Sequence, residues 1–192
     1  MNKGYKYIFG GFLLVLIDIN IGRFDLLPDV LGYYLVFLGL GYLYAKTDFW
    51  FFRFARFLSV SMICVSILDV VTGMLGWIQM GTFFNYAVII VGWLSELLLV
   101  VYIYQGMTVH MTMLKETTLS HQFGSELKRY AVIQGLCLLV MSFSLNMSKE
   151  GSGVYLFILM AISIIMHIRL LINLNAAKKL FRPEEVEIVE EL

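Results

Sequence analysis

The sequence predicts an all-α fold, a polytopic transmembrane helical bundle of six spans with both chain ends in the cytoplasm. The composition favours a membrane protein, because 60% of the 192 residues are hydrophobic and only 15% are charged. A soluble domain usually has about 25% charged residues. Long apolar runs and an uneven distribution of basic residues supply the number of spans and their orientation.

Six apolar runs are long enough to be candidate spans. A hydrocarbon core of about 30 Å requires about 20 apolar residues in a helix. The first two runs, 7–22 and 30–45, are shorter and need flanking aromatic residues, tilt or local thinning of the bilayer. Lys3 and Lys6 resemble the start of a signal peptide, but Asp18 stands where a cleavage site is expected, so we keep the first run as a span. The other runs are 57–78, 83–105, 130–147 and 153–174.

The basic residues predict the orientation. Lys and Arg accumulate on the cytoplasmic side of the spans of membrane proteins. If the N-terminus is inside, only Arg23 and Lys149 of the 14 basic residues fall outside, and this bias appears only with six spans. The sequence therefore predicts a single transmembrane domain, residues 1–182, and an acidic cytoplasmic tail, residues 183–192.

The longest polar connection, residues 106–129, has a helical pattern. Its apolar residues recur at helical spacing: Met107, Met111, Leu114, Phe123, Leu127 and Tyr130. We expect an amphipathic cytoplasmic extension of the fourth and fifth spans. A helix that binds a protein partner is the alternative interpretation. His110 and His121 in this connection are expected to be exposed to solvent rather than to bind a ligand.

The segment between the first two runs collects polar residues in an external turn: Asn20, Arg23, Asp25 and Asp29. Pro28 disfavours helix at the residue before it, so Asp29 is expected at or next to the N-cap of the second helix. The simplest interpretation is a structured hairpin in which Arg23 pairs with Asp25 or Asp29. Gly32 and Gly39 share one face of the second helix and permit close approach of another backbone.

The same segment carries a resemblance to known proteins. After a short helix that ends in DINIG, residues 24–33 read FDLLPDVLGY. This FDLLPD-x-x-GY segment resembles a motif of small, uncharacterised multi-pass membrane proteins of bacteria, and the resemblance covers about residues 1–45. It implies a location in the bacterial plasma membrane, the inner membrane, and it implies no particular activity.

Three carboxylates fall within the predicted spans: Asp18, Asp69 and Glu96. A charged side chain at the bilayer centre costs about 2.5–3.5 kcal/mol on insertion scales, so such residues usually face the bundle interior or water. Each of the three shares its helical face with small or polar residues, which favours an interior position. We predict that Asp69 and Glu96 line one cavity, with Asp18 toward its outer mouth.

The sequence shows no basic residue at the depth of these acids. They are therefore expected to be protonated, to be hydrated or to bind a cation. The alternative is structural, because a neutral Asp or Glu can link helices through hydrogen bonds worth about 0.6–2 kcal/mol. His167 could sense pH, but the sequence identifies no partner for it.

No catalytic, cofactor or metal-ligand motif is present in the sequence. We therefore expect no cofactor and no metal, and we assign no class of reaction. HExxH, GxSxG and phosphate-binding loops are absent. Cys64 and Cys137 lie in apolar runs and are interpreted as small core residues. We expect the lipid bilayer as a partner and no nucleic acid.

The first functional hypothesis is a small permease-like, ion- or proton-coupled transport protein. It would carry a cation or cationic solute through the acidic interior. The alternative is a non-enzymatic accessory or regulatory membrane protein that binds a partner through residues 106–129 or the tail. A membrane-embedded enzyme ranks third.

Overall fold

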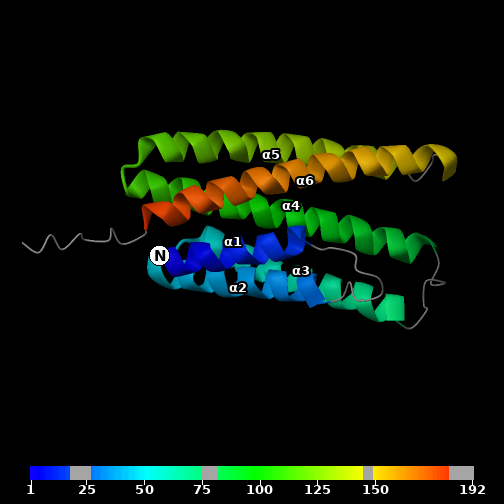
Figure 1. The fold of residues 1–192 in the computed structure, drawn as a ribbon, viewed down its shortest axis with the longest axis horizontal. Coiled ribbons are helices and arrows are strands. Elements are labelled where there is room, and N and C mark those ends of the chain that lie inside the picture. Colours follow the sequence, from blue (N-terminus) through cyan, green and yellow to red (C-terminus); the bar gives the residue numbers. More distant parts are fainter. Residues whose placement is uncertain (18–26, 75–81, 145–148, 182–192) are drawn as a thin grey trace, which may run out of the picture.

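The computed structural model describes residues 1–17, 27–74, 82–144 and 149–181. These residues form six helices and no strand, so the predicted all-α class is confirmed. The helices run side by side along the long axis of the molecule (Figure 1). They are α1 (Asn2–Leu16), α2 (Leu27–Thr47), α3 (Trp50–Met74), α4 (Thr82–Met113), α5 (Thr117–Ser144) and α6 (Lys149–Leu180).

The order of packing follows the order of the chain. Each helix from α1 to α5 contacts the next one, and α6 returns to pack on α1 and α5. The start of α1, the connection between α4 and α5 and the end of α6 lie at the same end of the bundle (Figure 1). The basic residues near these points, among them Lys3, Lys115 and Lys178, therefore gather at one end.

Three helices are long and apolar enough to cross a membrane, by length and composition, within the described ranges. Their apolar segments are Trp50–Leu68, Val88–Met113 and Phe157–Leu180. They support a membrane location, but they are three rather than the six that the sequence predicts. The difference has physical causes. Helix α1 has 15 residues, fewer than the about 20 that a bilayer core requires, and α5 is polar until Tyr130.

The outer surface of α5 and α6 is apolar. On α5, Val132, Leu136 and Leu139 are each more than half exposed and follow one another at helical spacing. On α6, Phe157 and Ile172 are exposed to a similar degree. Contiguous apolar surface of this kind marks contact with lipid or with another protein. This surface also runs along α5, a helix whose described residues are not apolar enough in succession to be counted as a span.

Helices α1 and α2 approach each other through glycines. A Cβ atom added at Gly39 would lie 2.7 Å from the backbone oxygen of Gly4, and one at Gly32 would lie 2.8 Å from that of Gly11. Such contacts are too short for any side chain larger than hydrogen. The prediction that Gly32 and Gly39 permit close backbone approach is therefore confirmed, with Gly4 and Gly11 as their counterparts.

The start of α2 differs from the prediction. The helix begins at Leu27, so Asp29 lies in its first turn rather than at the N-cap. Proline is tolerated in a first helical turn because its missing N–H would have no partner there. An acidic residue in this turn still interacts favourably with the helix dipole. The predicted cap is wrong in position, because Pro28 falls inside the helix instead of ending the turn.

The connection 106–129 is helical on both sides of a short turn, as expected for an extension of the two helices. Helix α4 ends at Met113 and α5 begins at Thr117, and Lys115 in the turn has a φ of 61°. Met107, Met111 and Phe123 are fully buried. The apolar side of this connection is therefore part of the core.

His110 is buried, so its predicted exposure to solvent is wrong. Its side chain is 3% exposed, and its Nδ1 atom lies 2.8 Å from the hydroxyl oxygen of Tyr5. The rings of Tyr5 and Phe181 stack against it. The first turns of α1 and the end of α6 cover this part of α4, and a local sequence pattern contains no sign of such contacts. His121 is exposed, as predicted.

Candidate functional site

A partly buried carboxylate links three helices near the middle of the bundle. Glu96 extends from α4 and accepts a hydrogen bond from the hydroxyl of Tyr33 on α2, at 3.1 Å. The same oxygen, Oε1, lies 3.0 Å from Nε2 of His167 on α6. The His167 side chain is 8% exposed and that of Glu96 is 21% exposed. The site is thus built from helices that are distant in the sequence.

The histidine contacts define where the protons lie. Nδ1 of His167 is 2.9 Å from the backbone oxygen of Ser163. A carbonyl oxygen only accepts, so Nδ1 carries a hydrogen. Nε2 and the Glu96 oxygen then share one proton, either on an imidazolium facing a carboxylate or on a carboxylic acid facing a neutral imidazole. The pair can therefore pass this proton between its members without moving a helix.

The Glu96 carboxylate borders a cavity of about 240 Å³ between α2, α3 and α4. The polar side chains that line it are Asp29, Tyr33, Ser66 and Glu96. The apolar lining consists of Met62, Val65, Val88, Ile89, Gly92 and Trp93. Two carboxylates and two hydroxyl groups in a space of this size suit water molecules and a small cation. Asp29 enters this cavity from the first turn of α2.

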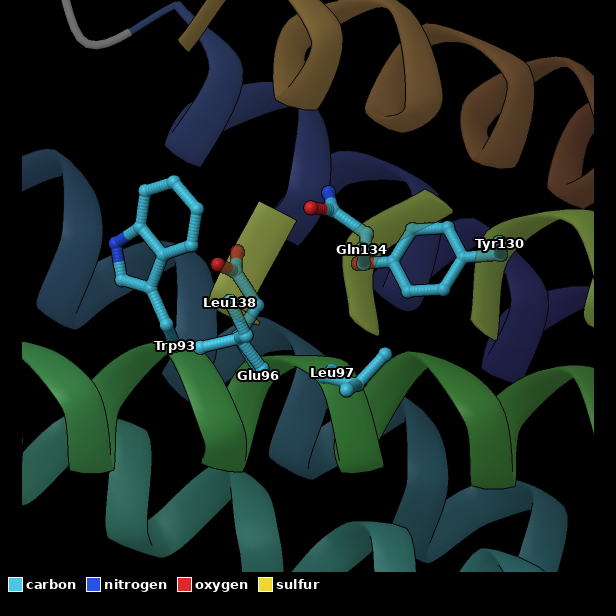
Figure 2. A pocket seen from close by; sticks show the side chains of 6 residues that line it. All are labelled: Trp93, Glu96, Leu97, Tyr130, Gln134 and Leu138. Carbon is cyan, nitrogen blue, oxygen red and sulfur yellow. The ribbon is translucent and has the colours of Figure 1, made fainter. Parts of the chain in front are cut away.

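A second, much smaller cavity lies on the other side of Glu96, toward α5. Its volume is about 10 Å³, room for about one water molecule. Figure 2 shows the Glu96 carboxylate with Trp93 on one side and Tyr130 and Gln134 on the other. Gln134 also donates a hydrogen bond to the Ser163 hydroxyl at 3.1 Å. Glu96 therefore lies between the larger cavity and this small cavity on the α5 side.

The predicted site residues have different outcomes. Glu96 lines the larger cavity. Asp69 belongs to α3, one turn after Ser66, and its side chain lies outside the described part of the structure. The remaining predicted residues lie outside the described ranges: Asp18, Asn20, Arg23 and Asp25. Asp29, which the sequence assigned only to the external hairpin, instead shares the cavity with Glu96.

The prediction that no basic residue lies at the depth of Glu96 is wrong, because His167 contacts it. The apolar run predicted that the last span begins at residue 153, but α6 begins at Lys149. Which side of α6 packs against α4 cannot be deduced from the sequence of α6 itself. Tyr33 was missed as a partner of Glu96 because the orientation of α2 toward α4 cannot be deduced from the sequence of α2 either.

The described side chains contain no group of three His, Cys, Asp or Glu residues that could hold a metal ion.

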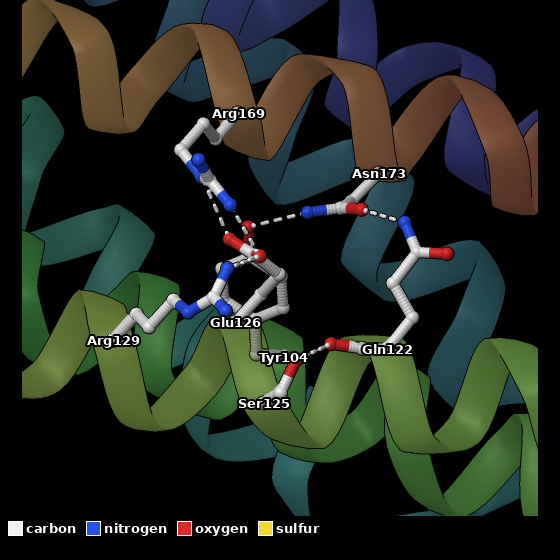
Figure 3. Close-up of polar contacts among 7 residues, drawn as sticks. All are labelled: Tyr104, Gln122, Ser125, Glu126, Arg129, Arg169 and Asn173. Atoms are coloured by element: carbon white, nitrogen blue, oxygen red, sulfur yellow. Dashed lines mark hydrogen bonds and ion pairs between the residues drawn. The ribbon is translucent and has the colours of Figure 1, made fainter.

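A second polar cluster lies nearer the basic end of the bundle (Figure 3). Glu126 on α5 is 6% exposed and accepts hydrogen bonds from Nε and Nη2 of Arg169 on α6, at 2.9 and 2.5 Å. Arg129 adds a third, at 3.0 Å. Beside it, Asn173 donates to the Tyr104 hydroxyl and accepts from Gln122. This cluster is fully paired and borders neither of the two cavities, so we assign it to helix packing.

Comparison with known proteins places no relative beside this chain. No family model matches the chain, no curated protein matches its sequence, and no solved structure matches its fold. The described residues define an all-helical protein with three candidate membrane spans and an acidic cavity between α2, α3 and α4.

Proposed function

We propose that this chain is a small ion- or proton-coupled transport protein for a cation or a small cationic solute. One observation carries the proposal: the Glu96 carboxylate, hydrogen-bonded to His167 and Tyr33, faces a cavity that it shares with Asp29. Acidic residues that face polar space within a membrane bundle are characteristic of ion and proton pathways.

The lining of the cavity supports a cation as the occupant. Asp29 and Glu96 offer carboxylate oxygens, and Ser66 and Tyr33 offer hydroxyl oxygens, which are ligands that hard cations prefer. The ring of Trp93 adds a face suited to an organic ammonium group. A volume of about 240 Å³ is below the range of about 300–1,000 Å³ that drug-sized ligands occupy. The proposed substrate is therefore an inorganic cation or a compact ammonium compound.

The Glu96–His167 pair provides a route for coupling. A cation beside Glu96 favours the carboxylate over the carboxylic acid. The shared proton then moves fully to His167 and can leave by way of water in the small cavity that Gln134 and Tyr130 line. When the cation departs, a proton returns to the pair. One cation entering and one proton leaving conserve charge, so the exchange is electroneutral for a monovalent cation.

We further propose six spans, with both ends of the chain in the cytoplasm of a bacterial plasma membrane. The shared end of α1 and α6, with the basic residues gathered there, supports an N-in orientation under the positive-inside rule. The exposed apolar stripe of α5 supports lipid contact for that helix. The shorter apolar segments would be completed by tilt or local thinning of the bilayer. The resemblance of residues 24–33 to a bacterial motif supports the choice of membrane.

The accessory alternative has less support at residues 106–129. Met107, Met111 and Phe123 would have to be available for a partner helix, but they are buried within the bundle. This alternative would then depend on the acidic tail alone.

The experiment is a flux assay in liposomes that contain the purified protein and an internal pH-sensitive dye. An inward gradient of Na⁺, K⁺ or methylammonium should make the interior more alkaline with at least one of the three. Glu96→Gln should reduce this signal at least tenfold, because the variant cannot release a proton. Glu116→Gln, the same change at the turn between α4 and α5, is the matched control and should retain wild-type flux. Wild-type flux in Glu96→Gln, or no flux with any of the cations, would refute the proposal.

A further inference from the structure

A basic pocket lies between the start of α1 and the end of α6. Its volume is about 260 Å³, and its lining residues are Asn2, Lys6, Asn175, Lys178 and Lys179. The candidate span Phe157–Leu180 ends at this level, so the pocket lies where a membrane span meets water. None of its residues takes part in the Glu96 site.

The chemistry of this pocket suits an anion. Three ammonium groups and two carboxamides line it, and no acidic side chain of the described ranges does. Among the described residues, the ion pairs involve Glu96 and Glu126, and neither contacts these lysines. Nζ of Lys178 lies 4.5 Å from the centroid of the Phe9 ring, which holds this lysine at the pocket. The positive charge is therefore concentrated and uncompensated by the described part of the chain.

The surface next to the pocket is apolar and continuous with it. Residues at spacings of three and four share one face of a helix, so Ile168 and Ile172 lie in line with Asn175 and Lys179 along α6. Ile168 is 44% exposed and Ile172 is 61% exposed. A molecule lying along this face would meet apolar side chains over two turns and then the positive pocket. This is the order of groups in an anionic phospholipid, from acyl chains to phosphate.

We propose that the pocket formed by Lys6, Asn175, Lys178 and Lys179 binds the phosphate of an anionic phospholipid, with an acyl chain along Ile168 and Ile172. Basic pockets between membrane helices at the cytoplasmic boundary bind anionic headgroups in this way. The proposal requires this end of the bundle to lie at a membrane surface. It does not depend on the transport of a cation through the Glu96 cavity.

The test is native mass spectrometry of the full-length protein in detergent, titrated with phosphatidylglycerol, with phosphatidylcholine or with inorganic phosphate. The full chain is used so that competition from the glutamates of the tail is included in the measured affinity. Lys6 and Lys179 are exposed, so the double variant K6Q/K179Q should fold. A lysine near a membrane surface contributes about 1 kcal/mol, or about fivefold, so the double variant should bind phosphatidylglycerol about 25-fold more weakly.

The matched control is Lys128→Gln, which removes the same charge from an exposed position on α5 at the same end of the bundle. It should retain wild-type affinity for phosphatidylglycerol. Phosphatidylcholine should bind at least tenfold more weakly than phosphatidylglycerol, and inorganic phosphate should not compete at millimolar concentration. Equal losses in K6Q/K179Q and Lys128→Gln, equal affinity for the two lipids, or full competition by inorganic phosphate would each overturn the proposal.

Discussion

Glu126 and Glu96, the two glutamates of the described residues that pair with other helices, have partners of opposite kinds. Glu126 contacts two guanidinium groups, which stay charged at any relevant pH. Glu96 contacts an imidazole and a phenol, and the imidazole can gain or lose a proton near neutral pH. Glu126 is therefore fixed in one charge state, whereas Glu96 can change its state when its surroundings change. This difference explains why we assign packing to the first and transport to the second.

The charge state of Glu126 leads to a prediction about pH. Hydrogen bonds from Arg169, and then its charge, hold the pKa of Glu126 below the ordinary value for glutamate. A lowered pKa in the folded state adds stability above the unfolded-state pKa, about 4.3, and this stability is lost as the pH falls through the folded-state pKa. Glu126→Gln should therefore cost about 1–2 kcal/mol at pH 7, a modest value because both arginines reach solvent.

The measurement is the thermal unfolding midpoint of the detergent-solubilised protein at pH 7 and at pH 3.5. The difference between wild type and Glu126→Gln should be largest at pH 7 and should shrink at pH 3.5. Glu116→Gln should show no difference at either pH. A gap that widens in acid would mean that the carboxylate does not stabilise the fold through these ion pairs.

Individual site residues were only partly predictable. Glu96 was identifiable because an acid in an apolar run is costly unless it faces polar space. His167 and Tyr33 were not identified as its partners, because their contacts depend on how α2 and α6 are turned toward α4. Asp29 was assigned to a helix cap because its local context, after Pro28, is typical of a helix start. The local sequence does not determine that Asp29 borders the Glu96 cavity, because the positions of the neighbouring helices α3 and α4 determine it.

At the scale of helices, the tightest packing in the described structure is between α1 and α2. It depends on glycines that occur at spacings of seven residues, Gly4 and Gly11 on one helix and Gly32 and Gly39 on the other. In a membrane, where apolar burial contributes little to helix association, such close contacts supply van der Waals attraction. The close contacts with α2 therefore stabilise α1 in the bundle, although α1 is short.

Gly39→Ala should destabilise the protein. Its Cβ would lie 2.7 Å from the oxygen of Gly4 and 2.9 Å from the nitrogen of Ile8, and both are backbone atoms that cannot rotate away. We expect a loss of about 1–3 kcal/mol, the usual cost of overpacking, seen as a lower midpoint of thermal unfolding. Gly10→Ala is the control, because nothing lies within 4 Å of its Cβ, and it should be neutral or stabilising by up to about 1 kcal/mol. Similar midpoints for the two variants would contradict the close packing.

The existence of all six helices was predictable from hydropathy, but their ends were not; the extension of α4 and α5 beyond their apolar runs was predicted instead from the helical spacing within residues 106–129. Helix α4 continues to Met113 and α6 begins at Lys149, both outside the apolar runs. Hydropathy identifies the part of a helix that is apolar enough to contact lipid. The helix itself can continue beyond this part where its backbone hydrogen bonds and its side-chain packing are maintained. The burial of Met111 and Phe123 supplies that packing at the ends of α4 and α5.

At the scale of the whole molecule, the bundle combines exposed apolar stripes, an apolar core that contains a few polar clusters, and a basic end. The six helices of the described residues alternate in direction, so the start of α1 and the end of α6 lie at the same end of the bundle. The sequence predicted this arrangement from six apolar runs together with the placement of Lys and Arg, because an even number of helices returns the basic segments to one side.

Labelling with an impermeant thiol reagent in intact cells tests the orientation. After replacement of Cys64 and Cys137 by alanine, single cysteines at positions 25 and 149 should react, because six spans with the N-terminus inside place both outside. A cysteine at position 115 should react only after the cells are permeabilised. Labelling of position 115 in intact cells would contradict the six-span arrangement.

The most direct test of the central claim asks whether the Glu96 cavity contains water. Ser66 lines this cavity. Cys64, two residues earlier on α3, is exposed on the bundle surface, so its prediction as a core residue is wrong, and we expect it to face lipid. A positively charged, water-soluble methanethiosulfonate should modify Ser66→Cys in a C64A/C137A background, and added substrate cation should slow the reaction. The same reagent should leave Cys64 unmodified when it is the only cysteine. Modification of Cys64 with an unreactive Ser66→Cys would contradict a water-accessible acidic cavity within the membrane.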